Sequence, residues 1–385
     1  MDGLTHSLVG LTSAKAGLER LSPYTAAACI LAANAPDIDV VSGFFGGRWF
    51  LLQHHRGITH SIIGTLVLGI LIPSILFAIE RAVANWRKQR PAIRYRGLLL
   101  ASLIAAATHP LMDWTNNYGV RPLLPWSGRW FYGDLVFIVD PYLILVLGGA
   151  AFLLTSDRRW KVVIWLLVAL IFTIILVLVS PQRAAGIGGL TVARIIWLSG
   201  VAVLLLARSL GLQKRVGKPL AFAALAFVLV YWGALAWAHR VAYHNAEAKA
   251  TAIALQRNER FIRAAAMPMA ANPFRWLCVA ETDHAMYRFF VGINEQSSAV
   301  QTDGDVSPIE RYEKPTGQAE RLVTAASRDP RAQILLGFAR FPIARVEGND
   351  CPGQALVQFA DLRYTEPGAS RGNFSLTVPV ECPAP

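Results

Sequence analysis

The chain has 385 residues, of which 54% are hydrophobic and 16% are charged, and its mean hydropathy of +0.40 lies above the range of ordinary soluble proteins. This composition excludes a purely soluble globular protein and indicates a membrane protein. The formal net charge is +12, but all of the positive excess lies in residues 1–239, among apolar segments where lysine and arginine set membrane orientation, so no nucleic-acid partner is expected.

Two short apolar segments open the chain, at residues 4–18 and 23–35. As helices, both are too short to cross a hydrocarbon core of about 30 Å, and we expect them to form a hairpin shielded by longer helices. Six longer apolar runs predict membrane-spanning helices. They lie at residues 62–80, 97–112, 135–154, 162–180, 192–207 and 219–238.

Lysine and arginine are concentrated in alternate connections between these runs, namely those that follow residues 80, 154 and 207. Because positively charged loops stay in the cytoplasm, these connections are predicted to be cytoplasmic. The intervening connections, and everything from His239 onward, are then predicted to lie on the outer face. The sequence therefore predicts a multi-pass protein with an extracytoplasmic C-terminal part.

The last third of the chain has a different pattern. Residues 240–265 are polar and rich in alanine and predict a helix, whereas short alternating runs after Phe274 predict β-strands. These runs are RWLCVAET, MYRFFVGIN, AQILLGFARF, ALVQFADLRY and NFSLTVPVEC. We expect an all-α membrane domain at 1–239, a helical connector at 240–270 and a β-rich soluble domain at 271–385. Cys351 and Cys382 are candidates for a disulfide in an oxidising compartment.

A cluster of ionisable residues precedes the first long apolar run, where residues 53–61 read QHHRGITHS. Histidines at the end of a membrane helix are costly to bury and point to ion binding or chemistry. The predicted topology brings further histidines and aspartates to the same outer face. Seven residues are thus candidate metal ligands: His6, Asp37, Asp39, His55, His60, His109 and Asp113. We interpret His54 as an interfacial residue outside the site.

The spacing of these residues supports a shared site. His109 and Asp113 are four residues apart and share one helical face. Gly57 allows a bend that turns the histidines on either side of it inward. Mixed histidine and aspartate ligands suit zinc, or manganese or iron where oxygen ligands dominate, and the number of candidates allows one or two metals.

Other residues on this face suit catalysis and substrate binding. Asp37 or Asp39 could act as a general base, and Arg56 could stabilise charge that develops on the attacked group. Arg121 and Arg129 could bind phosphate or carboxylate oxygens of a lipid-like substrate.

Four motifs in order carry a family resemblance: MDGLTHSLVG, APDID, HRGITHS, and HPLMDWTNNYGVRPLLP with RWFYGD. They resemble a bacterial inner-membrane family of metal-dependent hydrolases, a domain of unknown function whose members include a LexA-regulated membrane protein. The resemblance covers roughly residues 1–155. It implies a metal-dependent hydrolase of the inner membrane, and its motifs place the site at His6, Asp37, Asp39, His55, Arg56, His60, His109 and Asp113.

Three hypotheses follow. The leading one is a hydrolase with a divalent metal, zinc first, that acts on an ester or phosphoester of a lipid or envelope-related substrate at the outer face of the inner membrane. The second is a metal or proton transporter that uses the same cluster, which the nearly uncharged later spans disfavour. The third is a membrane scaffold that displays the β-rich domain to a partner, which leaves the cluster unexplained.

Overall fold

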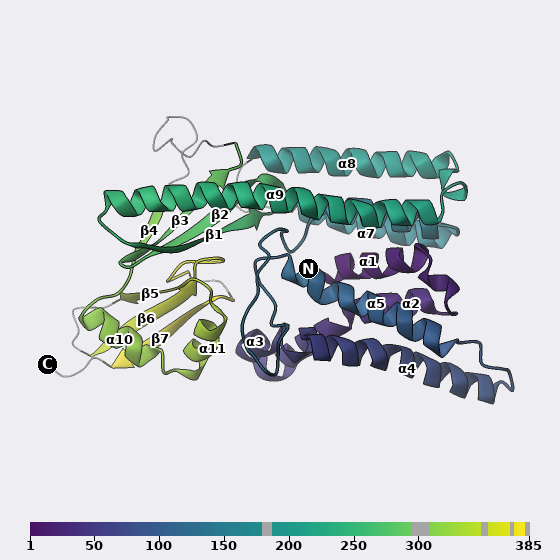
Figure 1. The fold of residues 1–385 in the computed structure, drawn as a ribbon, viewed down its shortest axis with the longest axis horizontal. Helices are drawn as coiled ribbons and strands as arrows, with labels where there is room; N and C mark the ends of the chain where they lie inside the picture. The colour runs from purple at the N-terminus through teal and green to yellow at the C-terminus, as the bar shows by residue number, and fades with distance from the viewer. Residues whose placement is uncertain (179–186, 295–308, 348–352, 370–372, 382–385) are drawn as a thin grey trace. The chain divides into compact units, whose positions relative to one another are not determined.

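The computed structural model describes residues 1–178, 187–294, 309–347, 353–369 and 373–381, and the chain divides into two compact units (Figure 1). The first unit comprises Met1–Asp39, Arg56–Trp237 and Pro268–Pro273, and the second comprises Val40–His55, Ala238–Met267 and Phe274–Pro385. Cys351 and Cys382 lie outside the described residues, so their expected pairing stays a prediction.

The first unit is helical. Its α-helices are α1 (Gly3–Lys15), α2 (Thr25–Asn34), α4 (Ile62–Trp86), α5 (Tyr95–Trp114), α6 (Pro141–Thr155), α7 (Arg159–Leu178), α8 (Ile187–Ser209) and the first part of α9 (Lys218–Gln256). Short 3-10 helices occur at η1 (Leu18–Arg20), η2 (Ala35–Val41), η3 (Ile58–His60) and η4 (Leu212–Lys214). The two short predicted helices correspond to α1 and α2.

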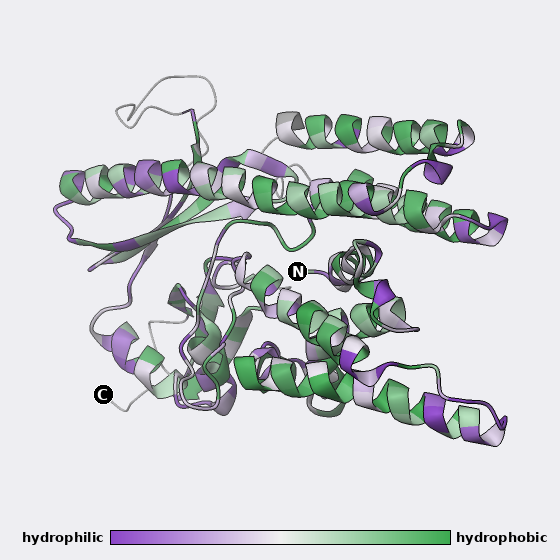
Figure 2. Cartoon of the chain, turned by 45° about the vertical axis from the view of Figure 1, so that its right-hand side comes forward, coloured by the Kyte–Doolittle hydropathy of each residue, from purple (hydrophilic) through white to green (hydrophobic). Residues whose placement is uncertain are grey.

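Within the described residues, 5 helical segments are long and apolar enough to cross a membrane: Thr25–His54, Ile62–Trp86, Arg159–Leu178, Gly189–Ser209 and Lys218–Gln256. Large apolar side chains are exposed along α4, α7 and α8, as expected for helices that contact lipid (Figure 2). The expected count of six long spans is therefore corrected. The run at 97–112 forms α5 but is not one of the five, and α6 has only 15 residues.

Local capping explains the shortness of α6. The Asp140 carboxylate accepts hydrogen bonds from the backbone N–H groups of Tyr142 and Leu143, each at 2.9 Å, and Pro141 occupies the first helical position. This combination starts a helix at a fixed residue, so the apolar residues before Asp140 remain outside it.

Small residues bring α1, α2 and α5 close together. The core between these helices consists largely of alanines, including Ala32, Ala33 and Ala105. At Gly10 a side-chain Cβ would lie only 2.6 Å from the carbonyl oxygen of Cys29, so α1 and α2 approach at the distance that glycine permits. This close packing places the N-terminal part of α1, the end of α2 and the end of α5 around one point.

The second unit contains two sheets. The first has the order β1-β2-β3-β4, formed by β1 (Phe261–Met269), β2 (Asn272–Thr282), β3 (Ala285–Gly292) and β4 (Glu310–Glu313). The second has the order β5-β6-β7, formed by β5 (Pro342–Glu347), β6 (Gln354–Asp361) and β7 (Ser375–Glu381). The helices of this unit are α3 (Ser42–His54), the second part of α9, α10 (Gln318–Ala326) and α11 (Pro330–Phe338). A β-rich C-terminal region is thus confirmed.

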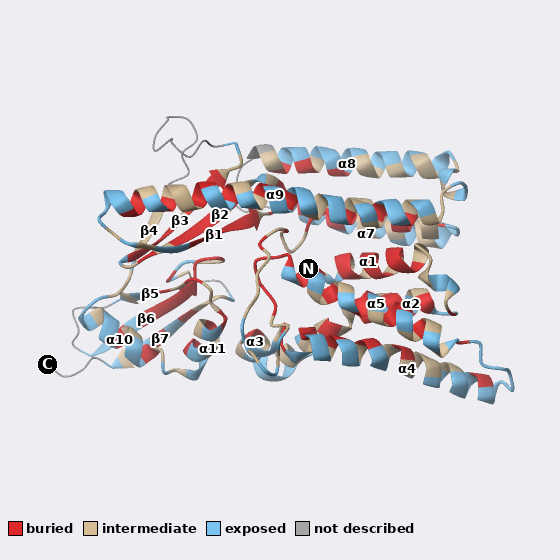
Figure 3. Cartoon of the chain, in the orientation of Figure 1, coloured by how far each residue is buried: buried red, intermediate tan, exposed pale blue. Residues whose placement is uncertain are grey.

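The two sheets pack face to face between helices (Figure 3). On one face of the first sheet, Trp276 and Tyr287 pack against alanines of α9. On its other face, Met267 and Val279 pack against Ile343 of the second sheet. Helices α10 and α11 lie against the second sheet.

Two predicted elements of this region differ from those in the structure. The helix after the last span is continuous with it and ends at Gln256, and β1 begins at Phe261, inside the expected connector. Residues 264–268 of β1 are all buried, because the strand lies between α9 and the second sheet, so no alternation marks it. The prediction of a strand over the run AQILLGFARF is wrong, because residues 332–338 belong to α11 and β5 begins only after the run, at Pro342. Asp329 caps a helix there and Pro330 begins it.

Candidate metal centre

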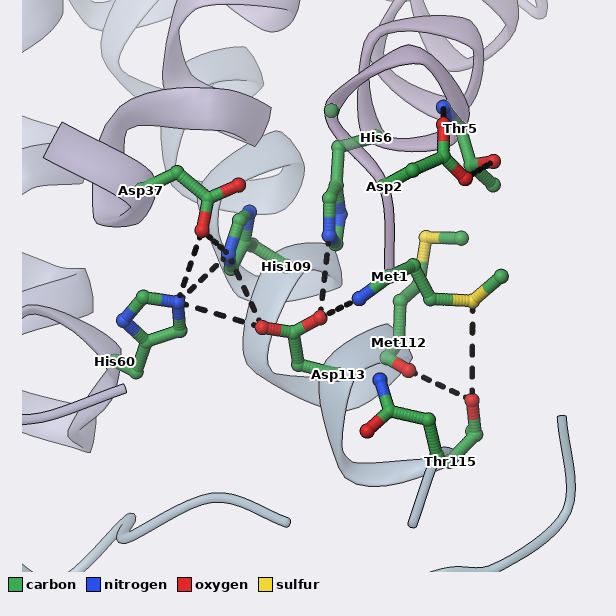
Figure 4. Close-up of polar contacts among 12 residues, drawn as sticks. Met1, Asp2, Thr5, His6, Asp37, His60, His109, Met112, Asp113 and Thr115 are labelled. Atoms are coloured by element: carbon green, nitrogen blue, oxygen red, sulfur yellow. Dashed lines mark hydrogen bonds and ion pairs between the residues drawn. The ribbon is translucent and has the colours of Figure 1, made fainter. Parts of the chain in front are cut away.

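Four side chains of the first unit converge on one point (Figure 4). Asp37 comes from η2, His60 from η3, and His109 and Asp113 from successive turns of α5. His60, His109 and Asp113 are buried, whereas the Asp37 side chain is 26% exposed and forms the open side of the cluster. The predicted convergence of these four residues on one place is therefore seen in the structure.

The distances between the converging atoms are short and similar. The Nε2 atoms of His60 and His109 are 3.1 Å apart. His60 Nε2 lies 3.4 Å from Asp37 Oδ1 and 3.3 Å from Asp113 Oδ2, and His109 Nε2 lies 3.5 Å from each of these oxygens. Each residue thus directs one potential ligand atom at the same small volume.

Hydrogen bonds on the far side of each ring fix which nitrogen faces this volume. His109 Nδ1 lies 2.6 Å from the carbonyl oxygen of Ala33, which can only accept, so Nδ1 carries the proton. His60 Nδ1 lies 3.2 Å from Asp39 Oδ2 and 3.1 Å from Thr59 Oγ1, whose hydroxyl donates to the same carboxylate oxygen at 2.9 Å. His60 Nδ1 is therefore also the donor. In the neutral form of each ring the Nε2 lone pair faces the cluster, as in metal-bound histidines oriented by a carboxylate or carbonyl.

The cluster has an excess of acceptors. Two protonated Nε2 atoms would place N–H groups head to head at 3.1 Å, so at most one of them carries a proton. Asp113 Oδ2 is buried and accepts no hydrogen bond in the described part of the chain. Acceptors that converge in a buried place are unfavourable unless a cation lies between them. The four side chains could therefore hold a metal ion.

The spacing also fits a tetrahedral ion. Bonds of about 2.0–2.1 Å from a central ion place tetrahedral ligand atoms about 3.3–3.4 Å apart. The five distances given above range from 3.1 to 3.5 Å. Two imidazole nitrogens and two carboxylate oxygens are a donor set that zinc accepts in proteins.

The other oxygen of Asp113 is held by several donors. The Arg56 guanidinium donates to Oδ1 from Nη2 at 2.9 Å, His6 Nε2 lies 3.3 Å away, and the Met1 amine also donates to it. Burial lowers the pKa of the Met1 amine well below its ordinary value. The His6 ring also stacks on His109, with ring centroids 3.8 Å apart. These contacts orient Asp113 so that Oδ2 faces the cluster.

Arg56 is itself fixed by its surroundings. Its side chain is 3% exposed, its Nη1 donates to Asn116 Oδ1 at 2.8 Å and to the Gly119 carbonyl at 3.2 Å, and its guanidinium lies over the Tyr118 ring. Its backbone is in the left-handed region, with φ of 55°, and its N–H donates to Asp39 Oδ2 at 2.9 Å. The described contacts of Arg56 therefore fit a role in positioning Asp113.

Comparison with known proteins places this chain in a family. The model of the YdjM inner membrane protein family matches residues 1–184. The inner membrane protein YbcI of Escherichia coli (strain K12) is 32% identical over 145 residues, which is 37% of this chain and 78% of YbcI. The chain belongs to the YdjM inner membrane protein family. The match contains all four converging residues and ends before the β-rich region.

A second relative covers a similar stretch. The uncharacterized protein YfhP of Bacillus subtilis (strain 168) is 28% identical over 155 residues, which is 38% of this chain and 43% of YfhP, so this chain spans less than half of that relative. No solved structure matches. Membership of the YdjM family, together with several apolar helices, supports a multi-pass protein of the inner membrane.

The remaining predicted site residues are not among the four that converge on this point. Asp39 contacts the far side of His60, and His6 contacts Asp113 Oδ1, so neither is among the four converging atoms. His55 follows α3 in the second unit. Arg121 lies over the Trp130 ring, and Arg129 is exposed and lies over Phe131. Their proposed functional roles stay predictions.

Several residues that support this site are not among the predicted site residues. Thr59 lies within the motif ITHS, and its hydroxyl donates a hydrogen bond to Asp39. Asn116 lies within the motif MDWTNN, and its side-chain oxygen accepts a hydrogen bond from Arg56. Polar residues within such motifs are a usable signal. No sequence signal marks the Ala33 carbonyl, because its hydrogen bond with His109 depends on where the backbone lies at the end of α2.

Proposed function

We propose that the chain is a membrane-bound metal-dependent hydrolase with zinc at the centre formed by Asp37, His60, His109 and Asp113. The observation that carries the proposal is the convergence of two oriented imidazole nitrogens and two carboxylate oxygens at tetrahedral spacing. Zinc is favoured over manganese or iron because half of the donors are nitrogens and the spacing is short.

When bound, such a metal supplies a hydroxide-like water at neutral pH and polarises a carbonyl or phosphoryl oxygen. The protein's own residues would accept a proton, position a metal ligand and bind the substrate. Asp37 is the most exposed of the four, so water would enter on its side, and the Asp37 carboxylate oxygen that does not face the cluster could accept a proton from that water. Arg56 holds Asp113 in place because its guanidinium donates a hydrogen bond from Nη2 to Asp113 Oδ1. Arg121 and Arg129 are the groups we propose for binding substrate phosphate or carboxylate.

The proposed substrate is an ester or phosphoester of a lipid or envelope-related molecule. Support comes from the family's place in the inner membrane and from the lipid-facing helices of the unit that contains the site. The distribution of positive charge among the connections supports a site, and a C-terminal region, on the outer face.

The hydrolase proposal predicts metal-dependent turnover. Full-length protein in detergent would be assayed against short-chain esters, phosphodiesters and phospholipids before and after chelation. We expect chelation to abolish hydrolysis, zinc to restore it, and a His60→Ala, His109→Ala double variant to remain inactive. His54→Ala is the matched control and should retain wild-type activity, because His54 is exposed and bonds to the Phe50 carbonyl of its own helix. Turnover that persists unchanged after chelation would contradict the proposal, and metal uptake into proteoliposomes without turnover would favour a transporter.

A further inference from the structure

The first unit contains a second notable feature, an apolar pocket bounded by α1, α6, α7 and α8. It is a partly open groove with a cavity volume of about 60 Å³, which suits a thin chain of methylene groups rather than a bulky molecule. Its walls include Leu4 and Leu8 of α1, Gly148 of α6 and Leu204 of α8. All of its lining residues are apolar side chains or glycines.

The two tryptophans of the pocket present no polar group to it. The indole N–H of Trp165 donates to Thr155 Oγ1 at 2.9 Å, and that of Trp197 donates to Thr173 Oγ1 at 2.8 Å. Water in the pocket would therefore lack hydrogen-bond partners, and apolar cavities of this kind stay dry. The pocket is suited to an apolar occupant.

Glycines shape the pocket. At Gly149 a Cβ would lie 2.9 Å from Leu204 Cδ1, so α6 and α8 are in close contact there. At Gly148 a Cβ would meet Leu8 Cδ1 at 3.7 Å, an ordinary van der Waals contact, so α1 and α6 approach there without requiring a glycine. The pocket extends along α6 from Ile144 to Phe152, a rise of about 12 Å.

The surrounding helices indicate which molecule fills this space. Helices α1 and α6 have 13 and 15 residues, or about 20 and 22 Å, which is short of a hydrocarbon core of about 30 Å. Helices α7 and α8 have 20 and 23 residues and expose apolar side chains. Because α7 and α8 form two walls of the pocket and are long and apolar enough to cross a membrane, the molecules beside the pocket in a bilayer are lipid acyl chains.

We propose that this pocket binds one acyl chain of a membrane lipid. Filling it restores the dispersion contacts that an empty apolar cavity lacks. On α1, Leu4 and Leu8 share one face, and His6, two residues from each, lies on the opposite face. The bound chain therefore supports α1 from the side opposite the metal centre. This lipid site is independent of the proposed hydrolase activity.

The proposal predicts a retained lipid and specific variants that lose it. Native mass spectrometry of the full chain in mild detergent, with one dioleoyl phospholipid added, should detect one tightly bound lipid. Gly148→Leu fills the pocket from α6 and should weaken lipid binding at least about tenfold, equivalent to about 1.4 kcal/mol of binding free energy. Gly233→Leu is the matched control and should bind as the wild type does, because Gly233 is exposed on α9 and a Cβ there would meet nothing within 4 Å.

Two further measurements distinguish loss of the lipid site from misfolding of the variant. Ala169→Leu fills the same pocket from α7 and should also lose the lipid while the protein elutes as the wild type does. A phospholipid with a photoreactive acyl chain should cross-link in the wild type to peptides of α6, α7 and α8 that line the pocket. Wild-type protein without a retained lipid, or Gly148→Leu and Ala169→Leu proteins that both keep it, would overturn the proposal.

Discussion

Replacing Asp113 with alanine is expected to abolish metal binding and to destabilise the first unit by about 3–5 kcal/mol. One oxygen of Asp113 faces the two imidazoles and the other accepts from Arg56, so one substitution removes a ligand and leaves a buried guanidinium without its carboxylate. The measurements are the metal content and the thermal unfolding of purified protein. The effect is large because Asp113 is 1% exposed and water cannot replace it.

Two controls sharpen this prediction. Asp113→Asn keeps the shape of the side chain and an acceptor for Arg56 but removes the negative charge, so metal binding should be lost with a smaller loss of stability. Asp157→Ala makes the same type of change at an exposed ion pair with Lys161 and should alter neither property. Asp113→Ala protein that retains its metal would contradict the assigned centre.

Replacing Arg56 with lysine is expected to weaken metal binding by about 10–100-fold, the usual effect of losing a group that orients a metal ligand. Lysine keeps the positive charge but lacks the planar fork that reaches Asp113, Asn116 and the Gly119 carbonyl together. Metal affinity would be measured by competition with a chelator of known affinity.

This variant also separates two roles for Arg56. If Arg56 acts only on charge that develops in the substrate, Arg56→Lys lowers turnover and leaves metal affinity unchanged. If it positions Asp113, as its buried contacts favour, metal affinity falls first. Arg129→Ala is the matched control because Arg129 is exposed and lies in the connection between α5 and α6, away from the segment before η3 that holds Arg56, and the metal affinity of this variant should equal that of the wild type.

The convergence of four of the candidate ligands could be predicted because helical spacing and chain topology decide it. His109 and Asp113 were placed on one face by their separation of four residues, and the order of apolar runs brought Asp37 and His60 to the same end. What spacing does not decide is which atom of each side chain faces inward. That depends on the Ala33 carbonyl, on Thr59 and on the left-handed backbone of Arg56. Spacing alone therefore does not distinguish the four converging residues from Asp39, which contacts His60 Nδ1, or from His6, which contacts Asp113 Oδ1.

Some elements of the fold could likewise be predicted from the sequence, and others could not. Strongly apolar runs predicted α4, α7, α8 and the start of α9, because lipid contact requires a long apolar segment. The N-cap at Asp140 makes α6 begin at Pro141, although the apolar run begins earlier in the sequence. Burial of β1 on both faces removes the alternation of apolar and polar residues that would identify it as a strand. Both differences arise where a local hydrogen bond or tertiary packing decides the structure.

The most direct test of the metal centre is elemental analysis of the purified full-length protein. We expect about one zinc ion per chain in the wild type, as a single tetrahedral set requires. His54→Ala protein should contain the same amount, and the His60→Ala, His109→Ala double variant should contain none. Equal metal content in the wild type and the double variant would contradict the account.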